Sequence, residues 1–242
     1  MSFLKSSDEI LEKLVKSFSD SCSIELLEVK AATGGTTFNA RNQSIWDVRN
    51  NRFVEVAKEL KLKPVHIKRT SLWESVAVLN EFTGELFLFF RENTYKKILK
   101  EIGKKPYHYL DCLLSKNRKY DYSALNAQET LFDNPDYENF RETLSKELLG
   151  NDYDKVKTVI IFTLEEAKGI TTGVNAILLS SKGDLVDAYK LTSFVSTNYS
   201  ESAALNEEYE DAIVKLKVDV TKNENKIQGI RLLNEKNESE KV

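Results

Sequence analysis

The stretch LWESVAVLNEFTGELFLFFR, residues 72–91, decides the fold. An apolar run over residues 76–79 and a second over residues 86–90 flank a short segment, residues 80–84, that contains glycine. Two apolar runs joined by such a turn predict a β-hairpin. The rest of the chain is organised around this hairpin.

Further segments have the composition or the two-residue alternation of β-strands. The predicted strands besides the hairpin are residues 65–70, 156–164, 174–180, 185–191, 213–220 and 226–233. Apolar residues at helical spacing alternate with these strands along the chain. The predicted helices are residues 7–18, 39–62, 94–102, 106–114, 136–149 and 201–210.

Three details of these elements are open or specific. Residues 23–30 either extend the first helix or form a short strand, and residues 117–135 are predicted to be a long loop with one helical turn. The helix over residues 136–149 is predicted to turn Phe140, Leu144 and Leu148 toward the core.

Two β-rich blocks therefore flank a helical centre. This order predicts an α+β fold with an antiparallel sheet built from hairpins and a meander, with helices packed on it. Because no linker-like segment separates the blocks, we expect one domain over residues 1–233, with sub-blocks 1–150 and 151–233, and a disordered tail over residues 234–242. Whether the two blocks share one sheet is open, as is the oligomeric state.

Composition narrows the class of protein. The chain has 242 residues, 41% of them hydrophobic and 30% charged, with a net charge of −3, so there is no global attraction to nucleic acid or to an anionic membrane. Cys22 and Cys112 lie far apart, and neither an apolar signal segment nor a membrane-spanning run is present. We expect a soluble cytoplasmic protein that does not bind a membrane.

No motif predicts catalysis. Glu28 and Lys30 form an E-x-K pattern, which on a strand is typical of metal-dependent nucleases, but Asp20 is too close in sequence to supply the upstream carboxylate. His66 and His108 have no Cys, Asp or His at ligand spacing. We expect no catalytic residue, no metal site and no cofactor.

Charge supplies the one regional signal. Residues 91–122 hold nine lysines and arginines against four acids, a net charge of +5, with five tyrosines among them. Basic residues set among aromatic ones bind phosphates and stack on bases. The candidate binding residues for a nucleic acid or a protein partner are Arg91, Lys96, Lys97, Lys100, Lys104, Lys105, Tyr107, Tyr109, Arg118 and Lys119.

The next segment has the opposite charge. Residues 129–154 hold eight acids and two basic residues, a net charge of −6. Three interpretations remain open: the two segments neutralise each other, the basic segment binds nucleic acid, or it binds a protein. Mutual neutralisation is the simplest of the three.

Several apolar and turn motifs together resemble a known group of proteins. They are Trp46-Asp47, Phe53, Trp73, the turn Phe82-Thr83-Gly84-Glu85, the run over residues 86–91 and the segment HYLDCLL over residues 108–114. Over most of residues 39–191 the chain resembles an uncharacterised family of Firmicutes bacteria and their phages, a domain of unknown function. The resemblance implies a phage or mobile-element setting and no particular activity.

The leading hypothesis is therefore a non-enzymatic interaction protein that binds a host or phage protein. The alternative is a nucleic-acid-binding protein that uses residues 91–122, or a metal-dependent nuclease that uses Glu28 and Lys30.

Overall fold

A computed structural model of the protein describes most of the first 195 residues. The described residues are 3–34, 39–70, 73–105, 107–123, 135–167 and 170–195. They all belong to one compact unit, Met1–Thr197. Outside them lie the helix predicted over residues 201–210, the strands predicted over 213–220 and 226–233, and the predicted tail, 234–242.

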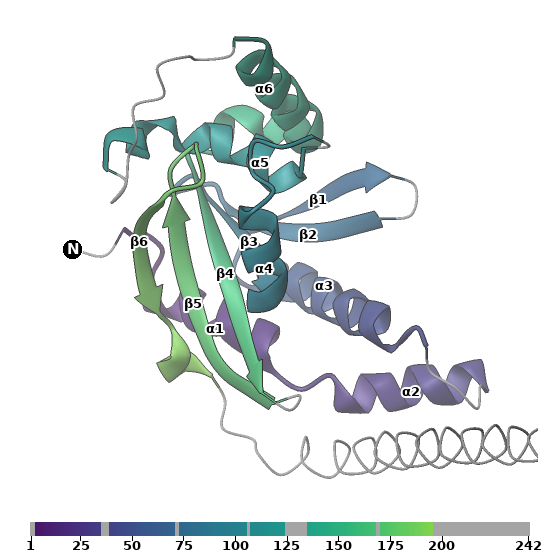
Figure 1. The fold of residues 1–242 in the computed structure, drawn as a ribbon. Coiled ribbons are helices and arrows are strands. Elements are labelled where there is room, and N and C mark those ends of the chain that lie inside the picture. Colours follow the sequence, from purple (N-terminus) through teal and green to yellow (C-terminus); the bar gives the residue numbers. More distant parts are fainter. Residues whose placement is uncertain are drawn as a thin grey trace, which may run out of the picture. The chain divides into compact units, whose positions relative to one another are not determined.

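The centre of the fold is one six-stranded sheet in the order β1-β2-β3-β4-β5-β6 (Figure 1). Its strands are β1 Lys63–Thr70, β2 Trp73–Asn80, β3 Glu85–Arg91, β4 Thr158–Ala167, β5 Ile170–Leu179 and β6 Leu185–Lys190. The α+β fold and the mainly antiparallel sheet are confirmed, and the two predicted β blocks share this sheet.

One strand pair departs from the predicted antiparallel pattern. β3 and β4 run parallel, with Glu85 opposite Thr158 and Arg91 opposite Leu164. The helical centre of the chain is therefore the crossover between two neighbouring strands, because parallel strands cannot be joined by a tight turn.

Burial on both faces explains the sequence of this parallel pair. Leu86, Leu88 and Phe90 belong to one core cluster, whereas Phe87 and Phe89 belong to a second cluster on the other face of the sheet. Neighbouring side chains of a strand point to opposite faces. A strand covered on both faces is therefore apolar at every position, as β3 is.

Helices cover both faces of the sheet (Figure 1). The second cluster includes buried residues of α1 and α3, and the first cluster includes those of α4, α5 and α6. The helices are α1 Asp8–Ser19, α2 Ser23–Thr33, α3 Arg41–Glu59, α4 Glu92–Leu99, α5 Tyr109–Leu114 and α6 Pro135–Leu149. Three short 3₁₀ helices complete the described chain: η1 Ser115–Ser123, η2 Gly150–Lys155 and η3 Thr192–Phe194. None of the helices in the described ranges is both long and apolar enough to cross a membrane.

Two local predictions need correction. The segment that was open between helix and strand is the separate helix α2, and the predicted loop begins with η1. On α6 the buried residues are Arg141, Ser145 and Leu149, whereas Phe140, which was predicted to face the core, is exposed. The buried row of α6 is largely polar, so hydrophobic spacing identifies the wrong face.

The turn between β2 and β3 is held from both ends. The Asn80 side-chain oxygen accepts hydrogen bonds from the backbone nitrogens of Phe82 and Thr83. The buried carboxylate of Glu85 accepts hydrogen bonds from the backbone nitrogen of Lys5 and the hydroxyl of Ser6. The predicted hairpin is confirmed, and its turn also anchors the N-terminal segment.

Candidate functional site

The ten candidate residues of the basic segment are distributed over β3, α4, α5, η1 and the connection between α4 and α5. Several of them have partners within the protein. Lys96 pairs with Glu92, Arg118 pairs with Glu138, and the ammonium group of Lys119 donates to the hydroxyl of Thr158. These contacts reduce the charge that the segment presents to a partner.

The two candidate tyrosines lie in packed surroundings. Tyr109 is buried and its ring centroid lies 6.0 Å from that of Phe90. The Tyr107 ring lies 4.7 Å from that of Tyr137 and 5.2 Å from that of Phe140, both on α6. Tyr109 therefore belongs to the core, and Tyr107 packs the α4–α5 connection onto α6.

Four candidate lysines remain exposed to solvent. They are Lys97, Lys100, Lys104 and Lys105. Among the described residues, no carboxylate lies within ion-pair distance of these four ammonium groups. The end of α4 and the turn after it are thus the part of the basic segment that carries uncompensated charge.

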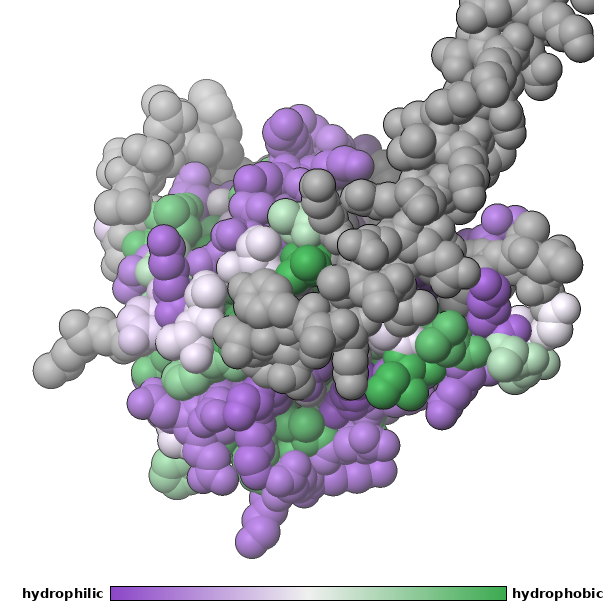
Figure 2. Space-filling model, turned by 90° about the horizontal axis from the view of Figure 1, so that it is seen from below, coloured by the Kyte–Doolittle hydropathy of each residue, from purple (hydrophilic) through white to green (hydrophobic). Residues whose placement is uncertain are grey.

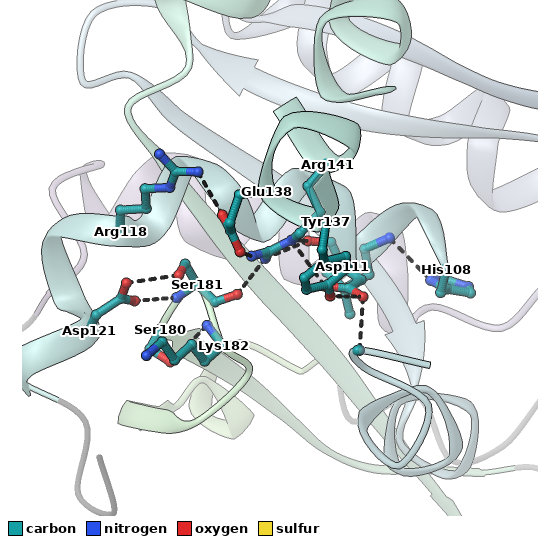
Figure 3. Close-up of polar contacts among 12 residues, drawn as sticks. His108, Asp111, Arg118, Asp121, Tyr137, Glu138, Arg141, Ser180, Ser181 and Lys182 are labelled. Atoms are coloured by element: carbon teal, nitrogen blue, oxygen red, sulfur yellow. Dashed lines mark hydrogen bonds and ion pairs between the residues drawn. The ribbon is translucent and has the colours of Figure 1, made fainter. Parts of the chain in front are cut away.

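The opposite-charge segments meet at a polar centre between α5 and α6, shown in Figure 3. Arg141 and Asp111 are both buried, and Arg141 Nε lies 3.2 Å from Asp111 Oδ1. Asp111 Oδ2 accepts hydrogen bonds from the Tyr137 hydroxyl and from the backbone nitrogen of Gly103. This centre ties α6 to α5 and to the turn after α4.

All three guanidinium nitrogens of Arg141 donate hydrogen bonds. Nε and Nη2 donate to the backbone oxygen of Asp111, Nη2 donates also to the backbone oxygen of Ser181, and Nη1 donates to Glu138. Ser181 in turn bonds to Asp121 of η1. A buried arginine saturated in this way holds α5, α6 and the β5–β6 turn together.

Glu138 bridges two arginines at the edge of this centre. Its carboxylate lies 3.0 Å from Arg141 Nη1 and 2.6 Å from Arg118 Nη2. Burial raises the pKa of Glu138, but Arg141 and Arg118 outweigh burial and hold that pKa below its ordinary value. Burial and the hydrogen bond to Asp111 together raise the pKa of Tyr137 far above its ordinary range.

A second carboxylate that bridges two arginines lies at the carboxyl ends of β3 and β4. Glu166 Oε1 lies 3.0 Å from Arg49 Nη2, and Glu166 Oε2 lies 3.1 Å from Arg91 Nε. Arg49 comes from α3 and is 4% exposed. Its guanidinium carbon lies 5.5 Å from the ring centroids of both Phe18 and Trp46.

The two clusters differ in how their buried arginine is satisfied. Nε and Nη1 of Arg49 are buried and have no hydrogen-bond acceptor among the described residues, and only Nη2 is bonded. Arg91 was a candidate from the sequence, but Arg49 and Glu166 were not. A charged residue in the buried row Ile45, Arg49, Phe53 and Ala57 of α3 is the signal that would have identified this site.

Helix α2 carries the largest exposed side chains of the helices on the side of the sheet that α1 and α3 cover. Only Leu26 of α2 is buried, whereas Ile24 is 59% exposed and Leu27 is 50% exposed. Figure 2 shows hydrophobic surface on the side of the molecule where α2 lies. Leu26 packs with Cys22 and Ile45, so one side chain connects this helix to the rest of the apolar core.

The residues of the nuclease hypothesis also lie on α2. Glu28 and Lys30 are on a helix rather than on a strand, and helical residues two apart do not face each other. Within the described ranges, no group of three or more His, Cys, Asp or Glu side chains is arranged to hold a metal ion. The histidines have local partners: His66 contacts Glu74, and His108 caps α5.

Comparisons with known proteins place the chain in a family. No curated protein and no solved structure matches it. Residues 4–235 match the model of DUF5986, which is described as a family of unknown function. Because the match extends over nearly the whole chain, the protein belongs to the DUF5986 family.

Proposed function

We propose that this chain is a non-enzymatic protein that binds another protein, and that α2 makes the contact. The observation that supports this proposal is the exposure of Ile24 and Leu27 on a helix that buries only Leu26. Clustered exposed apolar side chains are characteristic of protein-binding surfaces. An amphipathic helix of this kind binds by laying its apolar side chains into a groove.

The attachment of α2 suits it to this role. A helix of 11 residues is marginal in isolation, since isolated helices shorter than about 12–15 residues are barely stable in water. Arg52 of α3 supports its start, with hydrogen bonds to the backbone oxygens of Asp20 and Ser21 and an ion pair with Glu25. The helix is thus held at its first turn while Leu27 stays accessible.

The partner that this surface fits is a protein with an apolar groove wide enough for one helix. We propose that it is a host or phage protein met in the cytoplasm, in a phage or mobile-element setting. Binding would then bury Ile24 and Leu27 and remove them from water, which supplies the main driving force for association.

The double variant Ile24→Glu/Leu27→Glu tests this proposal. The full chain and the variant are each used to capture partners from the native host, and captured proteins are quantified by mass spectrometry. We expect the variant to lose one specific partner, because two buried charges would oppose docking. The matched control is Leu185→Glu/Tyr189→Glu, which places two acids on exposed apolar positions of β6.

Two results would contradict the proposal. The first is equal capture by the α2 variant and by the unmodified chain, with both shown to be folded by circular dichroism. The second is turnover of a substrate by the purified protein that disappears when one polar residue is replaced.

The four exposed lysines support a second candidate function, binding of nucleic acid. Lys97, Lys100, Lys104 and Lys105 carry uncompensated charge close together in sequence, and Lys104 Nζ donates to the backbone oxygen of Lys100 at 2.6 Å. Phosphate contacts by lysine make binding strongly dependent on salt.

Gel shifts with DNA and RNA at about 50 mM and about 200 mM salt test this candidate. If the four lysines contact four phosphates, affinity should fall about 100-fold between these conditions. Replacing all four by glutamine should abolish that dependence, whereas replacing Lys16, Lys58, Lys61 and Lys190 should not. An added arm with Mg²⁺ or Mn²⁺, with Glu28→Gln as its control, tests cleavage. Binding that does not respond to salt would exclude this second function.

A further inference from the structure

We propose that the cluster of Arg49, Arg91 and Glu166 is a binding site for an oxyanion, a phosphate or carboxylate group. Glu166 lies between the two arginines, 3.0 Å from Arg49 and 3.1 Å from Arg91. The site is at the carboxyl ends of the parallel strands β3 and β4. This is the edge at which sheets with parallel strands commonly bind ligands.

The unsatisfied donors of Arg49 are the first argument. Its Nε and Nη1 are buried without an acceptor in the described part of the chain. Phe18 and Trp46 lie 5.5 Å from its guanidinium carbon, but an aromatic ring stabilises the face of a guanidinium and leaves the in-plane N–H groups unpaired. Buried donors of this kind are rare in native proteins and commonly mark a missing ion or ligand.

The charge of the cluster is the second argument. Two guanidinium groups share one carboxylate, which leaves one positive charge uncompensated within the three residues. Arg91 Nε lies near Glu166 but has no aligned acceptor. The planar donor fork of arginine matches the paired oxygens of carboxylates and phosphates.

Access from solvent is the third argument. The side chains of Arg91 and Glu166 are 26% and 24% exposed, whereas that of Arg49 is 5% exposed. An anion therefore approaches over Arg91 and Glu166. Glu166 occupies part of the place that the anion would take, so the two carboxylate or phosphate groups compete for the arginines.

The cluster around Glu138 provides a matched control. It also has one carboxylate between two arginines, but every guanidinium nitrogen of Arg141 already donates a hydrogen bond. It offers no open donor on its buried arginine. We therefore expect no anion binding there.

Thermal unfolding of the full chain tests the proposal. The midpoint is measured with increasing inorganic phosphate, and separately acetate, up to about 10 mM at constant ionic strength, because a ligand that binds only the folded state raises the midpoint. For Glu166→Gln we expect a lower midpoint without anion and at least about 10-fold tighter binding, since the competing charge is gone. Glu138→Gln should lower the midpoint without any recovery by anion.

Phosphate also stabilises proteins generally because it is excluded from their surfaces, and the Glu138→Gln series measures that effect. A response to phosphate alone would identify a phosphate site, and a response to acetate alone a carboxylate site. Arg91→Gln, a change at a partly exposed residue, should weaken the response at least about 10-fold if Glu166→Gln fails to fold. Equal anion responses in the unmodified chain, Arg91→Gln and Glu138→Gln would overturn the proposal.

Discussion

Two places in this protein contain one glutamate between two arginines, and they differ in what surrounds the buried arginine. At Glu138, backbone oxygens of Asp111 and Ser181 take up the remaining donors of Arg141. At Glu166, aromatic rings surround Arg49 and leave two of its nitrogens without an acceptor. The same three side chains thus form a closed structural tie in one place and an unsaturated site in the other. Surroundings, rather than composition, distinguish a brace from a binding site.

The largest effect that separates the two clusters should come from Arg141→Met. The variant leaves the fully buried carboxylate of Asp111 without its counter-charge, and such a loss typically costs about 3–5 kcal/mol. Urea denaturation measures the free energy of unfolding. Arg118→Met, at the exposed side of the same cluster, serves as control and should cost less than about 1 kcal/mol. Similar costs for the two variants would show that Arg141 is not a brace.

A smaller loss is expected for Tyr137→Phe. The change removes the 2.6 Å hydrogen bond to Asp111 Oδ2 and retains the ring. A hydrogen bond to a charged group contributes about 1.5–3 kcal/mol, so we expect a destabilisation in that range by urea denaturation. No measurable change would mean that Gly103 alone is enough to satisfy this oxygen.

Arg49→Met tests the other cluster and should cost only about 1 kcal/mol, because it removes a single hydrogen bond. The methionine side chain can still pack against Phe18 and Trp46, and Glu166 keeps Arg91 as partner. The same denaturation experiment applies. If Arg49→Met destabilised the protein as much as Arg141→Met, the distinction between the clusters would be wrong.

The smallest effect concerns pH. The folded-state pKa of Glu138 is depressed, so its contribution to stability is present above the unfolded pKa, about 4.3, and is lost as pH falls through the folded pKa. The difference in unfolding free energy between the unmodified chain and Glu138→Gln should therefore be present at about pH 7 and shrink toward about pH 3. A difference that stays constant with pH would contradict this role of the charge.

Strand existence followed directly from local pattern, and strand direction did not. The run over residues 86–90 has no polar alternation because both faces of β3 are buried, and the same holds for the start of β4. Such runs are typical of parallel neighbours, so the pair was recognisable in retrospect. Which strands are adjacent depends on long-range packing that no local window contains.

The candidate sites show a similar limit. Both buried arginines lie in four-residue rows, Ile45, Arg49, Phe53 and Ala57 on α3 and Arg141, Ser145 and Leu149 on α6. A charged residue in a buried row was the available signal, but a search for apolar spacing treats it as an interruption. Mutual neutralisation of the opposite-charge segments was anticipated, and the pairing of Arg118 with Glu138 is an instance of it.

The parallel pairing of β3 with β4 has a consequence for synthesis of the chain. The strand β3 leaves the ribosome 66 residues before β4 begins. At about 5–20 residues per second, the hydrogen-bonding edge of the LFLFF run lacks its native neighbour for about 3–13 s. An apolar strand edge is a template for association with other chains. Interaction with a chaperone during this interval would protect the nascent protein, and the helices made in the meantime begin to cover one face of the exposed strand.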